Sequence, residues 1–442
     1  MGPHSVLVSR ELLPLILQFQ RGVFHEVRPL VPHIYANNFD FFPFTQVKYV
    51  GCHSVQAEGK LEADLSLFDG VFAPFVTQCG LRGVDRLLEC FPSMLSICLA
   101  DAARFGRLDL LQRLPPGVHL FQRRPTLMEL AASNGHGTIV TFLLSQGYPI
   151  CNVDVPAAAG HLAILETLHA TAHAFGTTRA MDQAAAHGHL HVVAFLHAHR
   201  EEGCTAAAMD VAAAQGHLPI VSFLHSRRQE GCTVAAVDGA ATAGHIRVVE
   251  FLLANRHEGG SADLMDRVAV AGHVAIMAML AQHGMTWSTQ AMDAAARHGF
   301  LHVIQFLHDQ QNGGGCTTHA MDAAAEYGFL EVVQFLHTHR HEGCTTYAMD
   351  RAAKNGFLEV VQFLHEHRTE GCTTNAIDWA ARNGQADVVA FLCAHREEGF
   401  TDRANVDART MGHAEIGRLL ETHWSKLQPS SLLVESKLGG SV

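Results

Sequence analysis

The sequence is poor in several features that mark common classes of protein. Its 442 residues include only 3 Trp and 5 Tyr, and they contain no run of 18 apolar residues that could cross a membrane. The N-terminus, MGPHSVLVSRELL, lacks the charged-then-apolar order of a signal peptide. We therefore expect no membrane insertion and a location in the cytoplasm or the nucleus.

Positive charge is also scarce. Asp and Glu outnumber Lys and Arg by 43 to 31, the formal net charge is −12, and no local basic stripe compensates for it. Nucleic acids and acidic membranes require a positive binding surface. The charge therefore argues against both as partners.

Sequence motifs of several enzyme classes are missing as well. The chain has no G-x-x-x-x-G-K-[ST], no G-x-S-x-G and no H-E-x-x-H. Its Ser and Cys residues have no catalytic partner that the sequence places beside them. We expect a protein that is not an enzyme and that holds no cofactor.

A 28-residue repeat organises most of the chain. Residues 320–375 read AMDAAAEYGFLEVVQFLHTHRHEGCTTY and then AMDRAAKNGFLEVVQFLHEHRTEGCTTN. Self-similarity at a period of about 20 to 50 residues is typical of a solenoid. The same frame recurs, 25 to 29 residues apart, around twelve glycines: Gly106, Gly135, Gly160, Gly188, Gly216, Gly244, Gly272, Gly299, Gly328, Gly356, Gly384 and Gly412.

Each unit has the pattern of two short helices. In the copy that begins at Ala348, apolar residues spaced i, i+3, i+4 predict one helix before Gly356 and another after it. Gly356 can adopt the left-handed backbone that reverses the chain. Gly371 then ends the second helix, and Thr373 or Thr374 is placed to cap the next first helix.

One unit resembles the ankyrin repeat, whose pattern is T-P-L-H-x-A-A-x-x-G-H-L-x-V-V-x-L-L-L. Residues 208–223, AMDVAAAQGHLPIVSF, match its Ala-Ala, Gly-His-Leu and apolar positions. Met and Asp replace the Leu and His of T-P-L-H, and the loops are too short for a long β-hairpin. The resemblance implies an all-α, ankyrin-type helix-turn-helix solenoid of about twelve repeats. A tetratricopeptide array would require a period of about 34 residues and an aromatic pattern that are absent.

The array is expected to occupy residues 94–424, with a mobile tail at 425–442. Residues 1–93 are expected to form an irregular N-terminal cap of helices or degenerate repeats, because terminal units of a solenoid must cover an apolar face. Within them, ELLPLILQF at residues 11–19 faintly resembles the opening of an F-box. That resemblance implies an alternative function, the substrate receptor of a ubiquitin ligase.

The eleven cysteines are expected to be free thiols. Neighbouring copies of one repeat position should lie about 8 to 10 Å apart, beyond the limit of about 7 Å for a disulfide. The cysteines at this position are Cys204, Cys232, Cys316, Cys344 and Cys372.

The 32 histidines give no metal-site pattern. Many occur as H-x-H, such as His337 and His339, and residues two apart on a helix face different directions. We expect no metal. In seven units a His follows the glycine, and the ankyrin resemblance implies a structural hydrogen bond for it: His136, His161, His189, His217, His245, His273 and His413.

One aspartate per repeat forms a column through eight repeats. We expect each to lie in the first turn of a first helix, where the helix dipole and loop amides favour an anion, rather than to form a functional acidic track. The column comprises Asp182, Asp210, Asp238, Asp266, Asp293, Asp322, Asp350 and Asp378.

Positions nine, five, two and one before each glycine vary freely between units. In ankyrin repeats the matching positions line the concave inner face, which binds protein partners. Large aromatic and charged residues occupy them in the C-terminal third, and such residues commonly anchor interfaces. We predict a monomeric scaffold or adaptor that binds protein through Tyr327, Tyr347, Arg351, Lys354, Trp379, Arg382 and Asn383, with the Trp379 indole facing the surface.

Overall fold

A computed structural model of the chain describes residues 24, 27–36, 55–113, 126–171, 174–310 and 314–427. Contacts divide the chain into two compact units. Unit 1 comprises Met1–Ala212 with Pro219–Gly231, and unit 2 comprises Ala213–Leu218 with Cys232–Val442. The F-box-like run at residues 11–19 and all but the first three residues of the predicted tail lie outside the described residues.

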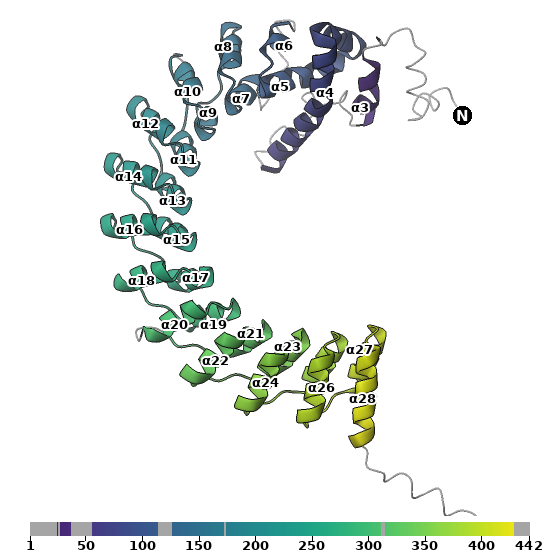
Figure 1. The fold of residues 1–442 in the computed structure, drawn as a ribbon. Coiled ribbons are helices and arrows are strands. Elements are labelled where there is room, and N and C mark those ends of the chain that lie inside the picture. Colours follow the sequence, from purple (N-terminus) through teal and green to yellow (C-terminus); the bar gives the residue numbers. More distant parts are fainter. Residues whose placement is uncertain are drawn as a thin grey trace, which may run out of the picture. The chain divides into compact units, whose positions relative to one another are not determined.

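Twelve helix pairs follow one another through the described ranges, one around each predicted glycine, which confirms the helical solenoid. Within each unit the first helices pack on one another in sequence order (Figure 1). The first helices are α5 (Leu95–Phe105), α7 (Leu127–Ser133), α9 (Asp154–Ala158), α11 (Arg179–Ala186), α13 (Ala206–Ala214), α15 (Val234–Thr242), α17 (Leu264–Ala271), α19 (Thr289–Arg297), α21 (Thr318–Glu326), α23 (Thr346–Asn355), α25 (Asn375–Arg382) and α27 (Asp402–Thr410). The second helices are α6 (Leu108–Arg113), α8 (Gly137–Ser145), α10 (Leu162–His169), α12 (Leu190–His199), α14 (Leu218–Arg227), α16 (Ile246–Asn255), α18 (Val274–Gln282), α20 (Leu301–Asp309), α22 (Leu330–His339), α24 (Leu358–His367), α26 (Ala386–His395) and α28 (Ala414–Leu427).

The core is a ladder of small and branched side chains. In α23 the buried face is Ala348, Met349, Ala352 and Ala353, and in α24 it includes Val360, Val361 and Leu364. This is the amphipathic spacing that the sequence predicts, and burial of the apolar stripe is what holds such short helices in place.

A glycine with left-handed backbone joins the two helices of each pair. Gly328 has φ of +79°, and a Cβ built on it would lie 2.6 Å from the ring of Phe357 in the next repeat. Glycine is therefore required both by the backbone conformation and by the close approach of that ring.

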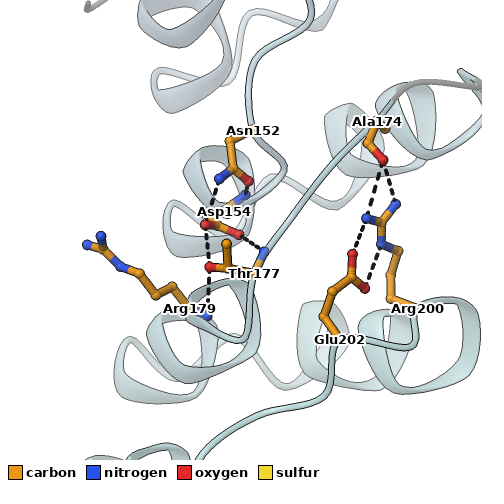
Figure 2. A network of polar contacts seen from close by, with 7 residues as sticks. All are labelled: Asn152, Asp154, Ala174, Thr177, Arg179, Arg200 and Glu202. Carbon is orange, nitrogen blue, oxygen red and sulfur yellow. Dashed lines mark hydrogen bonds and ion pairs between the residues drawn. The ribbon is translucent and has the colours of Figure 1, made fainter.

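An Asp in the first helix of one repeat accepts hydrogen bonds from the start of the next repeat (Figure 2). The carboxylate of Asp154 accepts from the backbone N–H of Thr177 at 2.8 Å and from its hydroxyl at 2.7 Å. The Thr177 hydroxyl oxygen in turn accepts from the backbone N–H of Arg179 at 3.2 Å, at the start of α11. We call this arrangement the Asp–Thr link. It recurs at Asp182–Thr205, Asp293–Thr317, Asp322–Thr345, Asp350–Thr373 and Asp378–Thr401, and with Ser at Asp266–Ser288.

The link corrects one expectation about the column. The expected place in the first turn is confirmed for Asp182, Asp266 and Asp378. The other five lie beyond the first turn, because their helices begin earlier, so the helix dipole is not the reason for an anion there: Asp210, Asp238, Asp293, Asp322 and Asp350. The expected loop amide is the partner, but it belongs to the following repeat. The predicted Thr cap is confirmed, and in α25 the hydroxyl that accepts from a helix N–H is that of Thr373.

Irregular helices precede the first pair. They are η1 (Arg28–Leu30), α3 (Val31–Ala36), α4 (Val55–Cys90) and η4 (Pro92–Met94), and α4 is interrupted at Gly80, where φ is 61°. Helix α4 packs on α5 with Phe68 and Phe72 buried. An Arg107 guanidinium between the two helices bonds to Asp69 of α4 and to the buried Asp101 of α5. These contacts join α4 to the first repeat.

Candidate partner-binding surface

The variable positions of the first helices lie mostly on the side away from the core, and Ala323 of α21 is an exception that is buried. In α23, Tyr347 and Asn355 are exposed and Arg351 and Lys354 are half-buried, whereas the Ala-Ala pair between them is fully buried. We call the residues nine, five, two and one before the glycines of the α19, α21, α23, α25 and α27 repeats the first-helix surface. All of them belong to unit 2.

All seven predicted site residues lie on the first-helix surface. The Tyr327 and Tyr347 side chains are 43% and 39% exposed. Of the remaining five, Arg382 and Asn383 are exposed, whereas Arg351, Lys354 and Trp379 are half-buried.

The guanidinium of Arg351 is stacked between two aromatic rings from consecutive repeats. Its central carbon lies 4.4 Å from the ring centroid of Tyr347 and 5.1 Å from that of Trp379. One guanidinium nitrogen also lies 3.4 Å from a carboxylate oxygen of Glu326. Each cation–π contact contributes about 0.5 to 1 kcal/mol where the pair is exposed. The four side chains therefore form one ordered cluster, which we call the Arg351 stack.

A second pair of the same kind lies one repeat toward the N-terminus. Arg297 donates a hydrogen bond to the Tyr327 hydroxyl at 3.3 Å, and its guanidinium carbon lies 5.7 Å from the Tyr327 ring centroid. Sequence reasoning did not place Arg297 or Glu326 in the site. Their position two residues before the glycine, which Lys354 and Arg382 share, is the signal that could have identified them.

The amide of Asn383 has a structural contact of its own. Its side-chain nitrogen donates to the backbone carbonyl of Lys354 at 2.8 Å, and Asn355 donates in the same way to the carbonyl of Glu326 at 2.7 Å. These bonds satisfy carbonyls at the ends of first helices. Asn383 thus fixes the orientation of neighbouring repeats at the edge of the surface.

The histidines contact protein groups. In the position directly after the glycine, a ring nitrogen of His136 lies 2.7 Å from the backbone carbonyl oxygen of Arg104. A ring nitrogen of His161 lies 3.1 Å from the carbonyl oxygen of Ser133. The predicted structural hydrogen bond is confirmed for these two histidines. On the second helices the His337 ring packs edge-on against Phe363, 5.5 Å between centroids. Within the described ranges no group of three His, Cys, Asp or Glu side chains could hold a metal ion.

The repeated cysteines are buried free thiols, as predicted. Burial, and secondarily the nearby Glu370 carboxylate, raises the pKa of the Cys344 thiol to about 12. Because the thiolate is the nucleophilic form, burial keeps Cys344 in its less reactive thiol form at neutral pH.

The helix pairs, the left-handed glycine turns and the links between repeats define a helical-repeat protein of the solenoid class. Residues 320–404 match the family model described as ankyrin repeats, in three copies. A comparison with curated proteins gave no match. Among the residues that the structure describes, no helix is both long and apolar enough to span a bilayer.

Proposed function

We propose that this chain is a non-enzymatic scaffold or adaptor that binds protein partners through the first-helix surface. Its ankyrin repeats are protein-interaction modules. The single observation that carries the proposal is the Arg351 stack, with the half-exposed ring of Tyr347 at its edge. Trp, Tyr and Arg are the residues in which interface energy concentrates.

The stack is suited to binding because it is already ordered. Arg351 is held by a ring on each side and by Glu326, so little side-chain freedom remains to be lost when a partner docks. Preorganised anchors of this kind raise affinity without additional contact area.

The proposal includes a monomeric chain in the cytoplasm. Buried free thiols support a reducing compartment. A ubiquitin-ligase receptor remains the alternative, and it rests on residues 11–19, outside the described residues. A deletion of residues 1–23 removes this run but keeps α4, which packs on α5. Loss of a ligase subunit from the purified complex, with an unchanged melting temperature, would favour that alternative.

The test of the proposal compares two substitutions at one repeat position. Trp379 and Val211 both lie five residues before their glycine, and Val211 is 39% exposed. The full chain, Trp379→Ala and Val211→Ala are each used for affinity purification with quantitative mass spectrometry. We expect a partner that the full chain and Val211→Ala retain and that Trp379→Ala loses.

Purified components then give the size of the effect. We expect Trp379→Ala and Tyr347→Ala each to weaken binding by about 1 to 4 kcal/mol and to change the free energy of unfolding by less than about 1 kcal/mol. A large loss of stability for Trp379→Ala, with the affinity of the folded fraction intact, would contradict the proposal.

A further inference from the structure

The first-helix surface is basic, although the chain is acidic. It holds five cations, Arg297, Arg351, Lys354, Arg382 and Arg403, and two carboxylates, Glu326 and Asp407, in a chain of net charge −12. These cations do not form a basic run in the linear sequence because they are spread over several repeats. Packing of successive first helices gathers them on one side of unit 2.

Three of these cations lack the compensation that other arginines in the chain have. At the ends of second helices, each repeated Arg is paired with the Glu two residues later, as in Arg340–Glu342, Arg368–Glu370 and Arg396–Glu398. Within the part of the chain that the structure describes, Lys354, Arg382 and Arg403 form no such ion pair. The first-helix surface therefore retains positive charge that a partner could neutralise.

The spacing of the cations indicates the form of that partner. Lys354 and Arg382 occupy the same position in two consecutive first helices, α23 and α25, which pack on each other. Packed helices lie about 8 to 10 Å apart. A segment in the extended polyproline II conformation has three residues per turn and advances about 3.1 Å per residue, so residues three apart lie on one side of it and about 9 Å apart. Carboxylates at positions i and i+3 of an extended segment match this interval.

The surroundings favour a protein over a nucleic acid. Glu326 lies between Arg297 and Arg351 in the row of cations, Asp407 follows Arg403, and the rest of the chain is strongly acidic. A continuous phosphate backbone would meet both carboxylates, whereas a peptide can place neutral residues opposite them. The exposed face of Tyr347, a member of the Arg351 stack, offers contact for an apolar peptide side chain.

The geometry points to an extended, acidic protein segment as the occupant, with two carboxylates three residues apart that face Lys354 and Arg382. This inference rests on the proposed function and names the chemistry of its partner.

The experiment titrates the full chain with fluorescent twelve-residue peptides, followed by anisotropy. One peptide has Glu at i and i+3 around a Leu in a Gly/Ser background, a second has the two Glu adjacent, and a third has Lys at i and i+3. A single-stranded oligonucleotide of equal length is the fourth probe. We expect the i, i+3 acidic peptide to bind about tenfold or more tightly than the Lys peptide, more tightly than the adjacent-Glu peptide, and less tightly as salt is raised.

Charge reversal supplies the specific test. Lys354→Glu with Arg382→Glu should weaken binding of the i, i+3 acidic peptide by about tenfold or more and strengthen binding of the Lys peptide. The control is Arg179→Glu with Arg227→Glu, which makes the same change in net charge at two exposed arginines of unit 1. We expect the control to bind like the unmodified chain.

Three results would overturn the inference. The first is that no peptide binds or that all bind equally, and the second is that the two double variants weaken binding equally. The third is that the oligonucleotide binds more tightly than the i, i+3 acidic peptide and that Lys354→Glu with Arg382→Glu abolishes its binding. If the peptide results fail while a purified partner still depends on Trp379, the acidic occupant is wrong and the proposed function stands. If the partner is indifferent to Trp379 as well, both are wrong.

Discussion

Helices α11 and α25 have the same buried side and different exposed sides. The buried residues are Ala180, Met181, Ala184 and Ala185 in α11 and Ala376, Ile377, Ala380 and Ala381 in α25. At the variable positions, Gln183 and Ala186 of α11 correspond to Trp379 and Arg382 of α25. Asp182 and Asp378 make the same link to the next repeat. The scaffold and the recognition chemistry therefore occupy separate sets of positions, and each can change without the other.

Replacing residues of the first-helix surface, with the buried residues left unchanged, should produce the largest effect on partner binding. Tyr347→Ala, Arg351→Gln and Trp379→Val together install the residues that Ala207, Gln183 and Val211 provide at matching positions in earlier repeats. We expect partner binding to weaken by about 4 kcal/mol or more, roughly a thousandfold, because the whole anchor cluster is lost. Titration calorimetry with the purified partner measures this. The free energy of unfolding should change by less than about 2 kcal/mol. Retained affinity would place the anchors elsewhere.

Changing the glycine turn should instead affect stability, equally in the two units. Gly160 and Gly328 have φ of +80° and +79°, and a Cβ on either would lie 2.6 Å from a ring of the next repeat, His189 and Phe357 respectively. We expect Gly160→Ala and Gly328→Ala each to cost about 2 to 4 kcal/mol, from left-handed strain and from the clash. Thermal melts followed by circular dichroism measure the loss.

The control is Gly412→Ala. Its φ is +85°, but nothing lies within 4 Å of the added Cβ, so only the strain of about 1 to 2 kcal/mol should remain. Equal losses at all three glycines would show that the following ring does not constrain the turn.

Removing one Asp–Thr link should cost less, and burial should decide how much. Asp350 is 3% exposed, whereas Asp182 is half-buried. Asp350→Ala leaves the Thr373 N–H and hydroxyl without their acceptor away from water, and we expect a loss of about 2 kcal/mol, against about 1 kcal/mol for Asp182→Ala. Urea denaturation measures both. A larger loss at Asp182 would mean that burial does not set the cost of the link.

The smallest predicted effect is on pH dependence. Burial lowers the pKa of His189 and of His337, with a secondary contribution from nearby His187 and His191 in the first case and from Arg368 and His367 in the second. The folded chain thus prefers these rings neutral. Their contribution to stability is present above the unfolded pKa of about 6.5 and is lost as the pH falls below it.

Two natural replacements isolate this effect. His189→Phe installs the residue of the matching Phe329, and His337→Leu that of Leu253. Each should show a smaller fall in melting temperature between about pH 7.5 and about pH 5.5 than the unmodified chain. Burial raises the pKa of Asp101 to about 7, so this carboxyl makes the protein more stable as the pH falls. That effect is the same in the unmodified chain and in the variants. His341 is exposed, and His341→Gln serves as the control. If the melting temperature falls as much in the two variants as in the unmodified chain, His189 and His337 are not the source of the pH dependence.

The fold was predictable because its determinants are local. The Ala-Ala pair, the glycine and the apolar residues up to eight positions later lie within one unit, and they predicted every described helix pair. What remained hidden joins different units: Asp350 binds Thr373, 23 positions away, and Arg351 stacks on Trp379, 28 positions away. A repeat pattern shows which residues recur but not that one copy's acceptor meets the next copy's donor.

The Asp–Thr link also makes each repeat self-complementary. A unit such as residues 317–344 offers a carboxylate, Asp322, to Thr345 of the unit after it and receives through Thr317 the carboxylate of the unit before it, Asp293. Inserting or deleting a complete unit therefore leaves no buried donor or acceptor without a partner at the new junction. The array can change its length by whole copies at little cost to folding, which is the property that duplication of a 28-residue segment requires, and residues 320–375 are such a pair of near-identical copies.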